Sequence, residues 1–295
     1  MKQQTGKLDK KEKVTAFLFI LPPLIGFTVF TLISLVISTV YSFTNFNPIK
    51  GAADFLGFGN YISLFTNDVY AKAFIDSIKN TLFLLLAVPF GIVIAIAIAG
   101  LMGSRSFKGG GFFRAVIYLP AVTSVVAVNY VWRYMFQDDY GIINSLLHVS
   151  IPWLSDDTLV KVAMIIKNIW GGLGTQVILF MAGMQNISDE YYEAADLDGA
   201  SGLEKFFKIT VPLLTPVLFY TVITGLIGSL QAYADVQLFA AGQYGSRTIV
   251  HFIWMRGIGQ NRYGLASAAS LLLAVSIMMI TVIQFKFSKW VVYNE

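Results

Sequence analysis

Hydrophobic and polar positions alternate along this chain in long blocks, not with the short period of a soluble helix or strand. A membrane-spanning helix needs about 20 mostly apolar residues. Six stretches without a charged residue meet that length or nearly so: residues 14–49, 80–104, 115–132, 168–188, 209–234 and 263–285. The pattern predicts an all-α membrane protein with six transmembrane helices.

Two of these stretches need adjustment. The first is too long for one crossing and ends in the loop-like Asn45-Phe46-Asn47-Pro48, so we expect a helix over residues 14–43, kinked at Pro22-Pro23. It also lacks an Ala-x-Ala cleavage site, which favours a retained anchor over a cleaved signal peptide. The third is the shortest, and we expect it to continue to residue 136 while Arg133 snorkels. One transmembrane domain, residues 14–285, then lies between polar tails at 1–13 and 286–295.

The placement of lysine and arginine predicts the orientation. Lys2, Lys7, Lys10, Lys11 and Lys13 crowd the N-terminus, and basic residues near membrane spans favour the cytoplasmic side. With six crossings, both termini and the segment between the fourth and fifth helices are then cytoplasmic. We expect a multi-pass protein of a prokaryotic cell membrane.

Composition narrows the function classes. The chain is 56% hydrophobic and 13% charged, with a mean hydropathy of +0.67, which disfavours a soluble fold, disorder and nucleic-acid binding. It has no cysteine and two histidines, so a metal centre is not expected. Neither a Gly-x-x-x-x-Gly-Lys-Ser/Thr nucleotide-binding motif nor a catalytic constellation is visible. We therefore expect neither an enzyme nor a chain that binds ATP itself.

The segment at about residues 189–212 is charged and amphipathic, which is unusual in so hydrophobic a chain. Asp198-Gly199 should end a first short helix, because glycine adopts the left-handed conformation readily. A second helix over residues 201–210 is predicted to have an apolar side. Pro212 and Pro216 should begin the fifth span, where a backbone N–H is not needed. Such a helix-turn-helix indicates a surface to which another protein binds.

This segment resembles the EAA loop of binding-protein-dependent ABC importer permeases: Glu-Ala-Ala, three residues, Gly, nine residues, Ile-x-Leu-Pro. Val211 replaces the usual leucine. Glu-Ala-Ala-x-x-Asp-Gly-Ala is similar to the branch for oligosaccharides, polyols and glycerol phosphate, and other segments resemble the maltose-type permeases. The candidate coupling residues are Glu193, Ala194, Ala195, Asp198, Gly199, Ala200, Leu203, Phe206, Phe207, Ile209 and Pro212.

The resemblance implies a role and a set of partners. The loop forms a coupling helix in a cleft of an ATPase subunit, with Leu203, Phe206 and Phe207 as apolar anchors. The partners are a second permease subunit, two ATPase subunits that bind ATP and Mg, an extracytoplasmic solute-binding protein and a carbohydrate. The chain itself then needs no cofactor.

Polar residues inside spans mark candidate substrate contacts, because such groups usually face a cavity or another helix. The fourth span carries a glycine-rich stretch from Asn168, and the fifth ends in Ser229-Leu230-Gln231-Ala232-Tyr233-Ala234-Asp235. The maltose-type resemblance implies sugar contacts from these two spans. The candidates are Asn168, Gly172, Thr175, Ser229, Gln231, Tyr233 and Asp235. Helix packing remains the competing interpretation for the small residues, and Asp235 has the alternative of capping the span.

Several alternatives stay open. A glycerol-phosphate importer would favour a basic pocket, but no lysine or arginine is expected deep in spans four to six except Lys167, which is expected at an edge. A polyol importer also stays open. A self-sufficient secondary transporter would need an intramembrane proton relay, which is not visible. Tyr244, Arg247 and Trp254 are candidates for contact with the external binding protein, although Trp254 and Arg256 suit interfacial anchors equally well.

Overall fold

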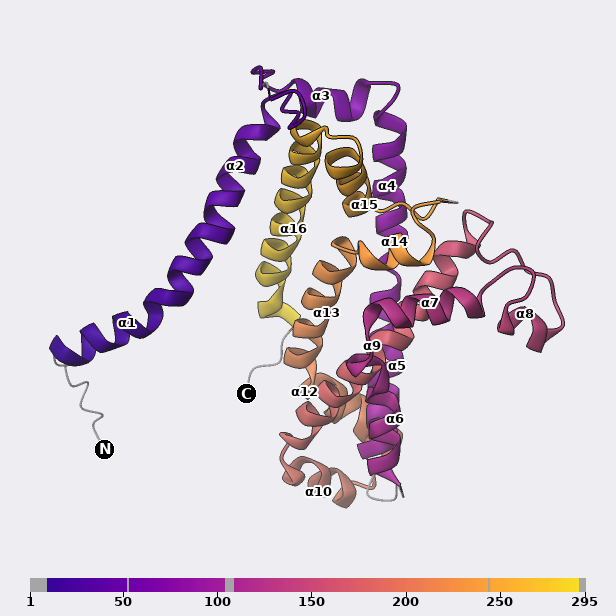
Figure 1. Cartoon of the computed structure of the whole chain (residues 1–295). Helices are drawn as coiled ribbons and strands as arrows, with labels where there is room; N and C mark the ends of the chain where they lie inside the picture. The colour runs from indigo at the N-terminus through magenta and orange to yellow at the C-terminus, as the bar shows by residue number, and fades with distance from the viewer. Residues whose placement is uncertain (1–9, 52, 104–108, 244, 292–295) are drawn as a thin grey trace.

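The structure, a computed structural model, describes residues 10–51, 53–103, 109–243 and 245–291. These residues form helices joined by loops, with one isolated β-bridge between Thr44 and Phe55 (Figure 1). Among them, four helices are long and apolar enough to cross a membrane, or up to six if two sharply bent helix pairs each count as one span. The predicted all-helical class is confirmed, and the count of six depends on those bent pairs.

The first candidate span is one long helix made of α1 (Lys10–Phe27), the π-helical turn η1 (Thr28–Leu32) and α2 (Ile33–Ser42). Figure 1 shows it changing direction between α1 and α2, where Pro22-Pro23 and the π-helical turn both disturb the α-helical hydrogen bonds. None of its most hydrophobic window is buried, and α2 contacts α16. Its apolar side chains therefore remain available to lipid.

The second candidate span combines α4 (Ala71–Leu84) and α5 (Ala87–Gly103), after the short α3 (Gly59–Thr66). It begins nine residues before the predicted start at residue 80, because Lys72, Asp76 and Lys79 lie on the helix instead of ending it. The last span, α16 (Tyr263–Val291), begins at the predicted residue.

The predicted third span over residues 115–136 is not one continuous helix. Helices α6 (Gly110–Val122) and α7 (Val125–Met135) meet at an angle of 100°. Thr123 and Ser124 adopt ψ angles of 146° and 128°, which interrupts the helical hydrogen bonds just after Pro120. Arg133 therefore lies on a helix that runs in a different direction from α6. The short α8 (Ile142–Leu147) follows.

Helix α9 (Leu159–Gln185) is the central span and packs mainly against α5 and α6. It begins nine residues before the predicted residue 168, so Lys167 lies well inside it. A buried apolar cluster of α5 and α9 side chains, including Ile92, Val177 and Phe180, joins the two helices. Glycine also permits close approach, since a Cβ added at Gly183 would lie 2.7 Å from Leu214 Cδ2.

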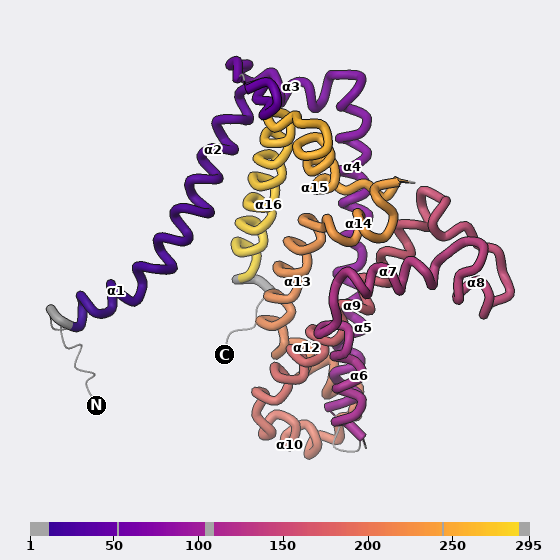
Figure 2. The backbone as a smooth tube through the Cα atoms, viewed as in Figure 1, coloured from indigo at the N-terminus to yellow at the C-terminus, as the bar shows by residue number. Residues whose placement is uncertain are grey.

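The chain then forms α10 (Asp189–Leu197), α11 (Gly202–Lys205), the π-helical turn η2 (Phe206–Thr210), α12 (Val211–Leu213) and α13 (Thr215–Leu230). The α11–α12 and α13 axes differ by 64°, so the predicted fifth span is also bent. After it come α14 (Ala234–Phe239), α15 (Ile249–Trp254) and η3 (Met255–Gly259). Figure 2 shows α10 at one end of the helix bundle and α3 at the other, which we call the α10 end and the α3 end.

Candidate functional sites: a helical loop and an interior cavity

The loop between α9 and α13 is built by local capping. Ser188 caps α10, whose first turn carries Asp189 and Glu190, charges that suit the positive end of a helix. Ser201 and Glu204 form a reciprocal capping box that starts α11. Between the two helices, Gly199 has a φ of +73°, which the glycine tolerates without strain. The predicted break and the predicted second helix are confirmed, although residues 206–210 of that helix are π-helical.

The outer surface of this loop carries large apolar side chains among charged ones. The exposed fractions are 91% for Leu197, 73% for Leu203 and 65% for Phe207. Glu193 and Asp198 are also exposed. Sequence reasoning missed Leu197, although its place directly after Glu-Ala-Ala-Asp on a short amphipathic helix was a usable signal. Three large exposed apolar side chains within eleven residues at the α10 end favour contact with another protein.

Phe206 does not belong to that surface. Its ring is partly buried against the α5–α9 cluster and contacts Gly100 of α5, where an added Cβ would come within 2.6 Å of the ring. The ring of Phe206 thus packs partly inside the protein, and its part in coupling to a partner stays a prediction. Its neighbour Phe207 is exposed, although the two rings touch edge to face at a centroid distance of 5.2 Å. Phe206 links the loop to a transmembrane helix instead.

Two further contacts make the loop one unit. Lys205 Nζ donates to Asp196 Oδ1 at 2.7 Å, which joins α11 to α10. The hydroxyls of Tyr192 and Thr210 lie 2.9 Å apart, which joins α10 to the start of the next span. A force on α10 would consequently reach both α5 and the α12–α13 helices.

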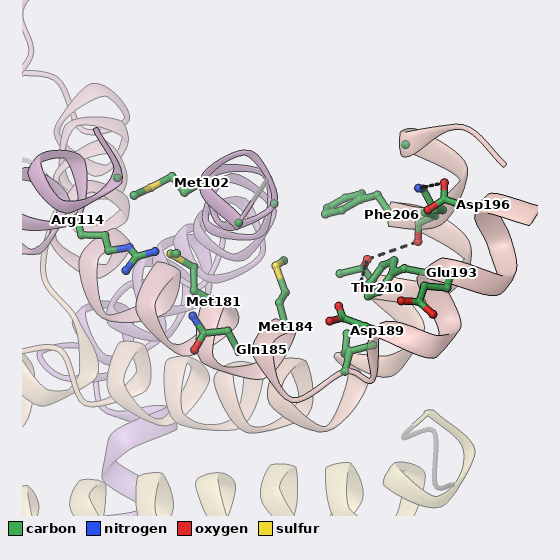
Figure 3. A pocket seen from close by; sticks show the side chains of 17 residues that line it. Met102, Arg114, Met181, Met184, Gln185, Asp189, Glu193, Asp196, Phe206 and Thr210 are labelled. Atoms are coloured by element: carbon green, nitrogen blue, oxygen red, sulfur yellow. Dashed lines mark hydrogen bonds and ion pairs between the residues drawn. The ribbon is translucent and has the colours of Figure 1, made fainter. Parts of the chain in front are cut away.

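Beside the contact of Phe206 with Gly100, a hollow of about 870 Å³ is lined by the loop and by the ends of α5, α6 and α9. Figure 3 shows Met181 and Met184 on the side of the spans and Phe206, Glu193 and Asp196 on the side of the loop. Of the other candidates, Ala195, Ala200 and Ile209 are half-buried, Ala194 is exposed, and Pro212 lies at the start of α12.

A second cavity, of about 340 Å³, lies where the bent helices meet α5 and α9. Its wall includes three of the predicted substrate residues, Asn168, Ser229 and Asp235. The side chains of Asn168 and Ser229 make no hydrogen bond with any described residue. The cavity therefore holds polar groups that the described chain leaves unsatisfied.

The other four candidates do not line this cavity. Thr175 and Gln231 are exposed. Tyr233 packs instead against Trp254, with ring centroids 5.6 Å apart. Gly172 lies beside the cavity, since an added Cβ would be 3.4 Å from Gln176 Nε2. Both predicted spans contribute residues to the wall, but the sequence did not show which side of each faces the cavity.

The most polar part of the wall is a charged cluster that the sequence did not reveal. Lys167, only 5% exposed, pairs with Asp235 Oδ1 and donates to Asn129 Oδ1 at 3.2 Å. Asn129 Nδ2 donates in turn to Asp235 Oδ1 at 3.0 Å. The expectation that Lys167 lies at an edge is wrong. Asp235 does lie in the first turn of α14, but it also joins α14 to α9 and α7.

Gln176 adds a carboxamide to the same wall. Its Oε1 is buried and has no hydrogen-bond partner among the described residues. Leaving such an acceptor unsatisfied costs about 1–3 kcal/mol. Glycine at 91 leaves room for this group, because an added Cβ would lie 3.5 Å from Oε1.

Some of the residues predicted to contact an external protein lie at the α3 end. Tyr244 lies outside the described residues. Arg256 is 8% exposed and stacks over Tyr70 and Phe252, so it is not an interfacial anchor. Burial lowers the pKa of Arg256. Among the described residues, no group of three or more potential metal-ligating side chains exists.

Residues 72–293, three quarters of the chain, match the family described as the binding-protein-dependent transport system inner membrane component. The chain belongs to this family. It is therefore a multi-pass membrane protein of the transport class rather than a member of an enzyme family, and the predicted ABC importer permease is confirmed.

Relatives that align over almost their whole length are also transport permeases. The chain is 32% identical to the multiple sugar-binding transport system permease protein MsmF of Streptococcus mutans, with 94% of this chain and 96% of that protein covered. It is 31% identical to the probable ABC transporter permease protein YesP of Bacillus subtilis, with 97% and 94% covered. It is 30% identical to the lactose transport system permease protein LacF of Rhizobium radiobacter, with 95% of each covered.

A solved structure shares the fold. A chain of a bacterial ABC transporter involved in the import of the acidic polysaccharide alginate superposes with a TM-score of 0.86. The two chains are 24% identical, with 97% of this chain and 98% of the other covered.

Proposed function

We propose that the chain is one permease subunit of an ATP-driven importer for an oligosaccharide. In this arrangement each bent helix pair is one span, which gives six transmembrane helices, and the α10 end with both termini is cytoplasmic. A second permease subunit, two ATPase subunits and an extracytoplasmic binding protein complete the transporter. The names of the relatives support a carbohydrate, since MsmF and LacF are described as sugar permeases.

The observation that carries this proposal is the α10–α11 loop. It exposes Leu197, Leu203 and Phe207 together at one end of the bundle, while Phe206 fixes it to α5. A surface of this kind suits a cleft in an ATPase subunit, with apolar residues as the main anchors. Closure of two ATPase subunits on ATP would then move the loop and reorient the spans, which is alternating access between two states.

Site-specific cross-linking tests the docking surface. We expect a cysteine at Leu203 or Phe207 to form a disulfide with cysteines in the cleft of the co-expressed ATPase. A cysteine at Val93, which is 68% exposed in the middle of α5, is the control and should form none. The chain has no cysteine of its own, so any disulfide it forms comes from the introduced residue. Cross-links from Val93 but not from the loop would contradict the proposal.

Reconstitution separates the importer from the secondary transporter. We expect ATP-dependent uptake only when liposomes contain both permease subunits and the ATPase, with the binding protein present. Uptake by this subunit alone would overturn the proposed function.

A further inference from the structure

The interior cavity has a wall whose hydrogen-bonding capacity is only partly used. Lys167 has three N–H donors, of which two are directed at Asn129 and Asp235. Asp235 accepts both of its hydrogen bonds on Oδ1, and Oδ2 has no partner within the described part of the chain. The pair therefore presents one unused donor beside one unused acceptor.

The cluster is held in place from three elements. Asn129 of α7 contacts both charged groups, and its Nδ2 also donates to Val125 O at 2.9 Å. Lys167 comes from α9 and Asp235 from α14. Side chains fixed in this way are ordered before a ligand arrives, so less entropy is lost on binding.

Gln176 supplies a further polar group on the same wall. Its unsatisfied Oε1 accepts a hydrogen bond from any hydroxyl that reaches it, and rotation of the terminal amide exchanges it with the Nε2 donor. Asn168 and Ser229 line the cavity as well. All of these groups suit hydroxyls, which both donate and accept.

We propose that the Lys167–Asp235 pair and Gln176 form a binding site for the hydroxyls of an uncharged saccharide. Neighbouring hydroxyls bind the pair, one donating to Asp235 Oδ2 and the other accepting from Lys167. The opposite charges of the pair cancel, so the wall offers no net charge to an anion. Phosphorylated and uronic-acid ligands are therefore disfavoured. This inference rests on the proposed function and specifies its substrate class.

Direct binding to the permease tests the site. Purified transporter complex, without its binding protein, is incubated with labelled maltose, trehalose, lactose or arabinotriose, and with labelled trigalacturonate as the anionic probe. We expect the wild type to bind at least one neutral sugar more than tenfold tighter than trigalacturonate. Equal or tighter binding of trigalacturonate, or no binding of any neutral sugar, would overturn the inference.

Two variants test whether Gln176 and Asp235 determine sugar binding. Gln176→Leu loses no hydrogen bond within the protein, so it should assemble normally and weaken sugar binding at least fivefold. Gln284→Leu is its control, because Gln284 also has a buried, unpartnered Oε1 but lies on α16 and does not line the cavity. Asp235→Asn removes the negative charge beside Lys167 and should improve trigalacturonate binding at least tenfold relative to the neutral sugar.

Lys161→Met controls for the loss of an α9 lysine, since Lys161 bonds Asn80 outside the cavity. We expect it to bind sugar as the wild type does, whereas Lys167→Met binds neither class tightly. If Gln176→Leu and Asp235→Asn bind both probes as the wild type does, the site is wrong. ATP-driven uptake of a neutral sugar with the binding protein present would still stand as evidence for the proposed function, so the two failures are distinguishable.

Discussion

Phe206 lies against Gly100, so the loop at the α10 end and the second transmembrane span meet through one aromatic ring and one glycine. A Cβ at position 100 would lie 2.6 Å from that ring, closer than van der Waals contact permits. The contact gives motion of the loop a direct route into α5. It also connects the exposed apolar surface of the loop with the packed core of the bundle.

A larger side chain at position 100 should uncouple the loop from the spans. We expect Gly100→Val to push the Phe206 ring away and to lower uptake at least tenfold, while ATPase subunits still copurify. Gly103→Val is the control, because an added Cβ there meets only Met184 Sδ at 3.9 Å. Parallel uptake and ATP-hydrolysis assays distinguish uncoupling from loss of assembly, and normal uptake by Gly100→Val would exclude this route.

The turn between α10 and α11 depends on Gly199. An L-residue in this left-handed conformation costs about 1–2 kcal/mol, and a Cβ at Gly199 meets nothing within 4 Å. Gly199→Val places a β-branched residue at this positive φ, so it should leave the bundle folded but change the turn, and we expect it to abolish uptake without abolishing membrane insertion. Gly202→Ala, also without a neighbour within 4 Å, should transport nearly normally.

Charge reversal in the same loop is an independent test. Glu193 is exposed on α10, so Glu193→Lys should not unfold the protein. We propose that the Glu193 carboxylate pairs with a basic residue of the ATPase, so we expect this variant to lose uptake. Retained uptake with retained ATPase binding would argue against a role for Glu193 in coupling.

The apolar side chains of the loop should contribute unequally to ATPase binding. We expect Leu197→Ser and Phe207→Ser each to weaken copurification of the ATPase by more than 1 kcal/mol, roughly fivefold or more, as for buried anchors of an interface. Phe206→Ser should instead lower the thermal stability of the permease, because it opens a gap against α5. The reverse result, in which Phe206 controls ATPase binding and Phe207 does not, would contradict the assignment.

The sequence predicted those parts of the molecule that depend on local signals. The start of α16 at Tyr263, the break at Gly199 and the capped helix after Ser201 all follow from neighbouring residues. The 100° bend at Thr123-Ser124 was missed, because an uninterrupted apolar stretch does not show whether its helix runs straight.

The interior cavity was only half predictable for a similar reason. Asn168 and Asp235 were found as polar residues near spans, but Lys167 was placed at an edge because its charge ended the apolar window. Its partners are 38 and 68 residues away in the chain, so no local pattern shows that its charge is neutralised. The inward packing of Phe206 likewise depends on Gly100, which belongs to another span.

His251 makes the α3 end sensitive to acid. It is 2% exposed, and its Nε2 lies 2.9 Å from Gln237 Oε1. Burial, with a smaller effect of Arg247, lowers its pKa to about 4 from 6.5. Between pH 4 and pH 6.5, His251 therefore binds a proton in the unfolded chain but not in the folded protein. Stability is fully present above pH 6.5 and falls as the pH decreases toward 4, by at most about 1.4 kcal/mol per pH unit.

This dependence is measurable as the apparent melting temperature of the detergent-purified protein at pH 7.5 and at pH 5. We expect the acid-induced decrease to shrink in His251→Gln, because glutamine does not titrate and still reaches Gln237. His148→Asn is the control, since His148 is exposed and asparagine tolerates its positive φ of 54°. Position 251 cannot bind a proton in His251→Gln. If this variant kept the full acid-induced decrease in melting temperature, the decrease would have to come from other groups.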